Sequence, residues 1–243
     1  MESAHIVKSF DGDLKQIESL LLEMGGMVET QIADAVTALI QRDVELGEKV
    51  RAADKKIDVL ETRIDDLVIR LLALRQPMAE DLRSVVCALK VSSNLERIGD
   101  YAKNIAKRTS VLATWQPTKS SINTIKRMSK LVQDMVHDVL NAYLARDAGT
   151  AEDLRLRDEE VDQMHNTLFR ELLTYMMEDP RNITPCMHLL FIAKNIERMG
   201  DHTTGIAEQV YYLVEGSLPE DDRPKGDVTS YMSVDPDGQA KQD

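Results

Sequence analysis

Two heptapeptides of nearly the same sequence carry the side chains of this chain that are best suited to chemistry. NLERIGD spans residues 94–100, and NIERMGD spans residues 195–201. Residues four apart lie on one face of a helix, so each heptapeptide presents two carboxylates from adjacent turns. These pairs are Glu96 with Asp100 and Glu197 with Asp201. Paired carboxylates of this kind bind cations or basic side chains.

A second set of carboxylate pairs precedes the heptapeptides, at the same spacing of four residues. Asp54 pairs with Asp58, and Asp158 pairs with Asp162. The offset between the two copies is 104 residues for these pairs and 101 residues for the heptapeptides. The four acidic pairs therefore hold corresponding places in an internal repeat.

The chemistry of these pairs depends on how close they come to each other. Two unit charges about 4 Å apart repel by about 4 kcal/mol at an effective dielectric constant near 20, so a facing set needs protons, basic partners or a metal ion. Ligand sets made of oxygen alone favour Mg²⁺ and Mn²⁺, and they also accept iron. A single acidic pair is ordinarily a solvated helix face, and Arg97 and Arg198 offer neutralisation by surface ion pairs instead. Asp54 and Asp58 lie beside the apolar stripe of their helix, which favours the solvated interpretation for them. Glu96 and Asp100 continue the row of Val85, Leu89 and Ser93, which ought to be a packed face.

A glycine stands before the last aspartate of each heptapeptide. Gly99 and Gly200 each weaken a helix by about 1 kcal/mol relative to alanine. Close approach of another chain segment, or room for an ion, would explain a glycine at this position.

The composition narrows the class of protein. The chain has 243 residues, with 42 acidic against 30 basic side chains and a net charge of −12. Such an acidic chain is unsuited to direct nucleic-acid binding, which needs a basic surface. Cys87 and Cys186 show no metal-site spacing and are expected to be buried free thiols. No apolar run reaches membrane-spanning length and no leader is visible, so a cytoplasmic protein is expected, with membrane attachment only through partners.

The apolar pattern predicts helices throughout. One stripe with spacings of three and four marks the first helix, which we expect to begin after Asp11. The stripe consists of Ile17, Leu20, Leu21, Met24, Val28, Ile32, Ala35 and Leu39. Prolines at positions 77, 117, 180 and 185 separate the later helices, the third of which is expected at about residues 80–112. The fold class is all-α: two tandem three-helix bundles, at residues 6–115 and 118–216, followed by a disordered acidic tail at residues 217–243.

Enzyme interpretations find less support. A metal-dependent enzyme of the helical-bundle carboxylate type needs Glu-x-x-His on two helices, and this chain does not have the motif on two helices. Asp162-x-x-His165 comes nearest, but its counterpart is Asp58-x-x-Glu61. No phosphate loop or nucleophile elbow appears, so we assign no catalytic residue. This enzyme class stays an alternative, as does a scaffold whose acidic faces are merely solvated.

The repeated motifs give the chain a resemblance to a known family. D-x-x-x-D on the second helix, and E-R-[IM]-G-D followed by Ile105-Ala106 or Ile206-Ala207 on the third, resemble the PhoU family over about residues 6–216. The resemblance implies a cytoplasmic, often dimeric adaptor without enzymatic activity. It would modulate high-affinity phosphate import and repress the phosphate-starvation response. Its partners would be the sensor histidine kinase of that response and the ATPase subunit of the phosphate ABC transporter.

The resemblance also implies metal ions (Mg, Mn, Fe or Zn) at the acidic motifs. By position, the metal-binding residues are Asp54, Asp58, Glu96, Asp100, Asp158, Asp162, Glu197 and Asp201. The two copies differ nearby, at Tyr101 against His202, Asn104 against Gly205 and Glu61 against His165. We therefore expect the two sites to differ in metal or in affinity.

Overall fold

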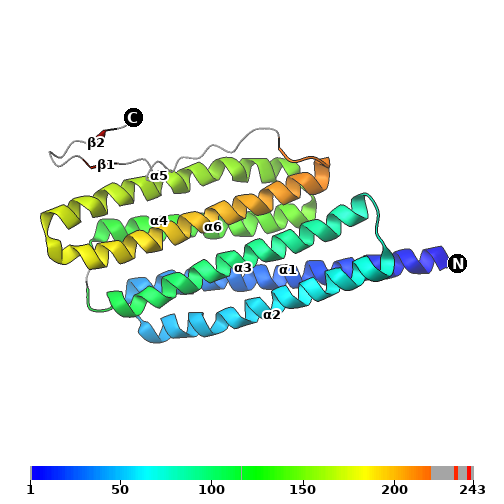
Figure 1. Ribbon diagram of the computed structural model, residues 1–243, viewed down its shortest axis with the longest axis horizontal. Helices are drawn as coiled ribbons and strands as arrows, with labels where there is room; N and C mark the ends of the chain where they lie inside the picture. The colour runs from blue at the N-terminus through cyan, green and yellow to red at the C-terminus, as the bar shows by residue number, and fades with distance from the viewer. Residues whose placement is uncertain (1, 116, 220–232, 235–239, 242–243) are drawn as a thin grey trace.

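A computed structural model describes residues 2–115, 117–219, 233–234 and 240–241, and within them six α-helices run along the long axis of an elongated molecule (Figure 1). The helices are α1 (Glu2–Gln41), α2 (Val44–Arg75), α3 (Glu80–Leu112), α4 (Lys119–Ala145), α5 (Ala148–Glu178) and α6 (Ile183–Glu215), with a short 3-10 helix η1 (Pro180–Asn182) before α6. The predicted all-α fold of two tandem three-helix bundles is confirmed.

Helix α1 buries the whole stripe that its sequence predicts, from Ile17 to Leu39. The predicted start of this helix is wrong, because α1 begins at Glu2 and Asp11 lies inside it as an exposed residue. No proline interrupts the residues before Asp11, so nothing ends the helix there. The predicted third helix at about residues 80–112 is confirmed by α3.

The first turn of each bundle is built in the same way. Arg42 and Arg146 both adopt the left-handed backbone conformation, with φ of 56° and 52°. The following aspartates each cap the next helix: Asp43 accepts from Leu46 N at 2.9 Å, and Asp147 accepts from Thr150 N at 3.0 Å. These caps make tight antiparallel hairpins of α1 with α2 and of α4 with α5. The repeated Arg-Asp dipeptide is therefore the signature of the hairpin turn.

The second turns of the two bundles differ. In the first, Gln76 ends α2 in the left-handed conformation, and Pro77 follows in the loop. In the second, Asp179 leads into η1, which starts at Pro180. Pro185 does not separate helices as predicted but lies in the first turn of α6, where a missing backbone N–H breaks no helical hydrogen bond.

The two bundles share one hydrophobic core. Helix α3 packs along α6, and α1 packs against α4. At the second contact, a Cβ on Gly25 of α1 would collide with the Leu140 side chain of α4, so the glycine lets the helices approach closely. The connection between bundles falls between Leu112 and Lys119. The division into separate domains at residues 115–118 stays a prediction.

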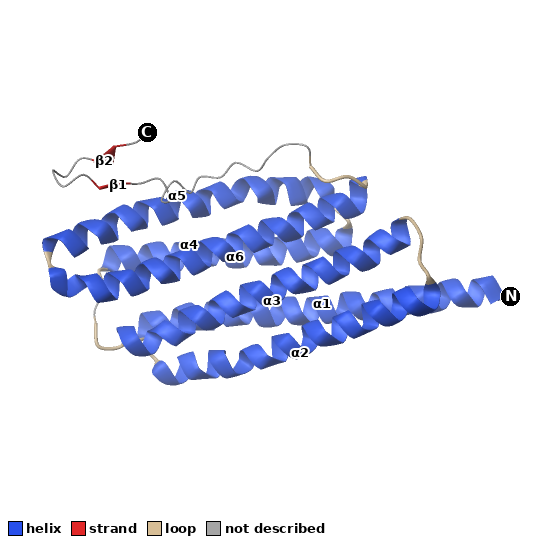
Figure 2. Ribbon diagram, viewed as in Figure 1, coloured by secondary structure: helices blue, strands red, loops and turns tan. Residues whose placement is uncertain are grey.

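The predicted disordered tail at residues 217–243 lies mostly outside the described residues. Four tail residues form two short antiparallel strands, β1 (Ser233–Val234) and β2 (Ala240–Lys241) (Figure 2).

Two further expectations concern single features. Cys87 and Cys186 are confirmed as buried free thiols. Within the described residues, no helix is both long enough and apolar enough to cross a membrane.

Candidate functional site

In the first bundle, a lysine lies between carboxylates of α2 and α3. Lys103 Nζ donates to Asp54 Oδ2 and to Asp100 Oδ1, each at 2.5 Å. Burial by itself lowers the pKa of Lys103, but the hydrogen bonds to Asp100 and Asp54 outweigh it, so the net pKa is raised. The ammonium group therefore stays charged and joins the two acidic motifs of this bundle.

Asp54 is the most deeply buried of the four motif carboxylates of the first bundle. Its side chain is 4% exposed, and Gln31 of α1 donates to its Oδ1 at 3.2 Å. The expectation that Asp54 and Asp58 would both lie on a solvated face is wrong for Asp54 and right for Asp58, which is exposed. Asp54 is drawn inward because α1 supplies an amide donor, which the α2 sequence does not reveal.

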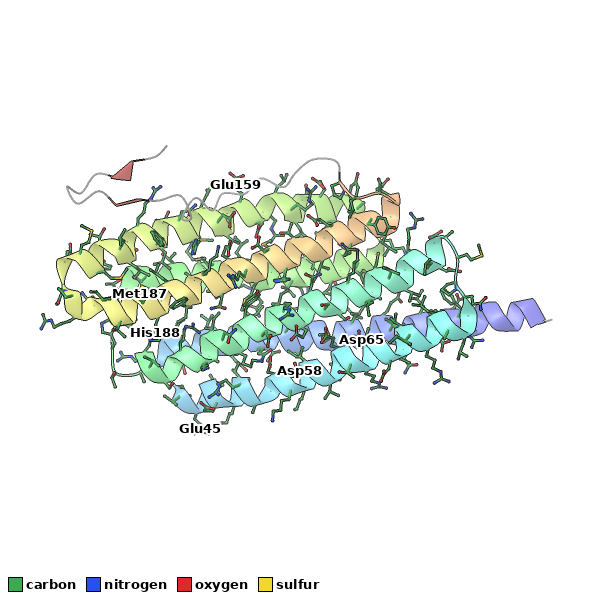
Figure 3. All side chains as sticks on the ribbon, viewed as in Figure 1. Glu45, Asp58, Asp65, Glu159, Met187 and His188 are labelled. Atoms are coloured by element: carbon green, nitrogen blue, oxygen red, sulfur yellow. The ribbon has the colours of Figure 1, made fainter. Side chains whose placement is uncertain are left out.

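Glu96 extends the acidic centre along α3. Burial raises the pKa of Glu96 to about 7, with smaller contributions from Asp100 and Glu61. Arg97 lies near both motif carboxylates, 3.6 Å from Glu96 and 3.8 Å from Asp100, and is largely exposed. The alternative of neutralisation by an arginine therefore holds in part for this bundle. Asp58 and Asp65 are labelled along α2 in Figure 3.

The second bundle buries its acidic residues more completely. Asp158, Asp162 and Glu197 are only 1%, 2% and 4% exposed, whereas Asp201 is half-buried. Lys194 Nζ donates to Glu197 Oε1 at 2.8 Å. Burial raises the pKa of Glu197, and the hydrogen bond from Lys194 opposes that rise. The two centres are therefore alike in their motifs and different in their surroundings.

Two observations in the second bundle fit a bound cation. Glu197 Oε2 is buried and has no hydrogen-bond partner among the described residues. A Cβ on Gly200 would collide with Asp158 Oδ1, so the glycine makes room for that carboxylate against α6. A buried carboxylate oxygen normally needs a donor or a cation. The residues present therefore suit a metal ion, with oxygen ligands from α5 and α6.

The side chains as they stand do not form a ready coordination shell. Across the described ranges, no three His, Cys, Asp or Glu side chains lie in an arrangement that could hold one ion. Binding in either bundle would therefore require some carboxylates to change rotamer. In the first bundle, it would also require Lys103 to move.

The predicted packed row on α3 is only partly buried. Val85 is buried, but Leu89 and Ser93 are exposed, and Glu96 and Asp100 are half-buried. The exposed and half-buried members of this row lie at the surface of the bundle. In the other copy the row is deeper, because Cys186 and Glu197 are both buried. The two copies therefore share the motif but bury it to different extents.

Three partners of the motif carboxylates were missed by sequence reasoning: Gln31, Lys103 and Lys194. The spacing could have indicated two of them, since Lys103 follows Asp100 by three residues and Lys194 precedes Glu197 by three. Gln31 carries no such signal, because only packing of α1 against α2 places it at Asp54.

Two repeats with acidic pairs on their second and third helices define a class of all-helical proteins with duplicated carboxylate motifs. The PhoU domain matches residues 21–109 and 125–210. The chain belongs to the PhoU family.

Similar proteins match along nearly the full chain. A phosphate-specific transport system accessory protein PhoU homolog from Rhizobium meliloti (strain 1021) is 46% identical over 232 residues, which cover 96% of this chain and 98% of the relative. The homolog from Caulobacter vibrioides (strain NA1000 / CB15N) is 49% identical, with 93% and 98% covered.

Two solved structures have the same fold. The crystal structure of PhoU from Pseudomonas aeruginosa superposes with a TM-score of 0.82 at 41% identity, covering 86% of this chain and all 100% of that one. The phosphate transport system regulatory protein PhoU from Streptococcus pneumoniae gives a TM-score of 0.81 at 31% identity, with 87% and 99% covered.

Proposed function

We propose that this protein is a negative regulator of the phosphate-starvation response and a modulator of high-affinity phosphate import. The observation that carries the proposal is its likeness to proteins described as phosphate-specific transport accessory proteins, at 46% and 49% identity over almost the whole chain. The matched length is enough to span both bundles and the positions of their acidic motifs.

The protein acts as a cytoplasmic adaptor without catalysis. Its partners are the sensor histidine kinase of the phosphate response and the ATPase subunit of the phosphate ABC transporter, and it works as a homodimer. The long helices support this role, because a rigid bundle held by one continuous core presents fixed surfaces to two partners at once.

The eight motif carboxylates bind divalent or transition metal ions, Mg, Mn, Fe or Zn. Support comes from the buried oxygen of Glu197 and from the room that Gly200 leaves at Asp158. A bound ion would offset the repulsion between the crowded carboxylates. The side chains of each bundle would hold the ion between its second and third helices, which stiffens the adaptor surface.

The regulatory role is tested by alkaline phosphatase output in phosphate-rich medium from a strain that lacks this gene. We expect constitutively high output, returned to a low level by the intact gene. Output that stays low in the deletion strain, with no second PhoU gene present, would contradict the proposal. Turnover of a small substrate by the iron-loaded protein would instead favour the helical-bundle enzyme.

The metal role is tested by replacing Glu96, Asp100, Glu197 and Asp201 with alanine together. We expect loss of bound metal, measured by elemental analysis of the purified protein, and weaker repression in cells. A matched variant removes the same number of negative charges from exposed positions, by replacing Glu45, Asp66, Asp153 and Glu159 with alanine. Equal metal content in the two variants would show that the motifs are merely solvated.

A further inference from the structure

Lys103 is held in a defined position by both acidic motifs of the first bundle. Its Nζ atom is 2.5 Å from Asp54 Oδ2 on α2 and 2.5 Å from Asp100 Oδ1 on α3. Asp54 is itself fixed, because Gln31 of α1 donates to its other oxygen at 3.2 Å. The ion pair therefore joins three helices and differs from a pair of freely moving surface side chains.

The other cation near this centre is placed differently. Arg97 approaches Glu96 and Asp100 only to 3.6 Å and 3.8 Å, and its side chain is 58% exposed. Lys103 is 34% exposed and makes two short contacts. Of these two basic residues, Lys103 supplies the positive charge that neutralises Asp54.

The equivalent position in the second bundle carries no charge. The offset that aligns the two heptapeptides places Thr204 opposite Lys103, and Thr204 is 1% exposed. The lysine that contacts a motif there, Lys194, comes from one turn before Glu197, at the place that Ser93 holds in the first bundle. The two repeats therefore bring their ammonium groups to the acidic centres from different positions.

We propose that Lys103 is the built-in cation of the first acidic centre, and that it excludes metal from Asp54 and Asp100 while joining α2 to α3. An ammonium group and a divalent ion cannot both contact these two oxygens, because the positive charges repel each other at that distance. The first bundle takes up metal only when Lys103 leaves. This inference rests on the proposed metal-binding function and predicts that the two bundles bind metal unequally.

The experiment compares Mn²⁺ binding by the full chain and by its Lys103→Met variant, with stoichiometry from isothermal titration and native mass spectrometry. Methionine removes the charge and keeps an unbranched side chain, one atom shorter than that of lysine. We expect about one additional Mn²⁺ per chain in Lys103→Met. Lys55→Met, which removes an exposed lysine from α2, is the matched control and should bind Mn²⁺ as the unchanged protein does.

The location of the added ion is checked by a double variant. Lys103→Met combined with Asp54→Asn should lose the additional Mn²⁺, because asparagine removes the charge of the buried ligand. Equal binding by the unchanged protein and Lys103→Met would overturn the proposal, as would added binding that survives Asp54→Asn. A protein that binds no Mn²⁺ until Lys103 is replaced would support this inference and contradict metal binding as part of the proposed function.

A second readout needs no metal. In chelator-treated protein, Lys103→Met should lower the Tm by about 5 °C, because Asp54 stays buried without its cation, and Mn²⁺ should restore the loss. If the methionine variant does not fold, Lys103→Thr is used in its place, because threonine is the residue that the second bundle accommodates at this position. An unchanged Tm in the metal-free variant that folds would also overturn the proposal.

Discussion

Tyr101 and His202, which occupy the same position in the two repeats, contact each other across the interface between the bundles. Tyr101 Oη is 3.5 Å from His202 Nε2, and the ring centroids are 5.6 Å apart. Asn94 donates through its amide to Lys90 O, so its Oδ1 faces His202 Nδ1 at 2.9 Å. Nδ1 of His202 therefore carries a proton, and burial lowers the pKa of the ring, which favours its neutral form.

Replacing His202 with alanine should weaken this interface. Asn94 Oδ1 and the Tyr101 hydroxyl would both lose their partner, so we expect the free energy of unfolding to fall by about 2 kcal/mol and the Tm by about 6 °C. Thermal unfolding followed by circular dichroism measures the change. His137→Ala is the control, since that histidine is 61% exposed and makes only one long contact within the described residues, of 3.5 Å, to Glu29. Equal shifts of the Tm in the two variants would show that the contacts of His202 add nothing to stability.

Gly200→Ala should destabilise the protein, and Gly26→Ala should not. The new Cβ at position 200 would collide with the Asp158 carboxylate, whereas nothing lies within 4 Å of a Cβ at position 26. We expect a loss of about 1–3 kcal/mol for the first variant and a gain of about 0.5–1 kcal/mol for the second. Chemical denaturation gives both values. A gain at position 200 would mean that Asp158 moves aside freely.

The aspartate caps of the two hairpins should contribute alike. We expect Asp43→Ala to lower the Tm by about 3 °C, and Asp147→Ala should lower it too. Hydrogen bonds from Thr150 hold the pKa of Asp147 below its usual value of 3.8. A depressed pKa gives a contribution that is complete above the ordinary pKa and is lost as the pH falls through the folded-state pKa. The difference between unchanged protein and Asp147→Ala should therefore narrow below pH 3.8 in acid unfolding experiments.

The two thiols should react slowly in the folded protein. Burial raises the pKa of Cys87 and of Cys186, so little thiolate forms at neutral pH, and both side chains are buried. We expect labelling by a thiol reagent such as iodoacetamide to be complete only after unfolding. A control cysteine at an exposed site, Ser93→Cys, should react rapidly in the folded state. Fast labelling of the unchanged protein would contradict the packing of α3 against α6.

Much of the fold could be predicted from the sequence because helix signals are local. The stripe from Ile17 to Leu39 and the limits of α3 both depend on residues a few positions apart. The predicted start of α1 was wrong, since a good capping residue such as Asp11 can also lie within a helix when nothing interrupts the residues before it.

The candidate site was harder to predict because it depends on contacts between helices. Asp54 and Asp58 share one motif, yet the first is buried beside Gln31 of α1 and the second is exposed. Their counterparts Asp158 and Asp162 are both buried. Identical spacing on α2 and α5 therefore leads to different depths, because different neighbouring helices cover the two pairs.

The sequence by itself determined the helical class of this protein, its duplication and the residues of its acidic motifs, since these follow from periodicity and from residue type. Tertiary structure alone decided that Lys103 connects Asp54 to Asp100 and that Tyr101 meets His202. Asp54 and Lys103 lie on different helices, and Tyr101 and His202 lie in different bundles. Their contacts therefore exist only when the packing of the core brings those helices to within hydrogen-bonding distance.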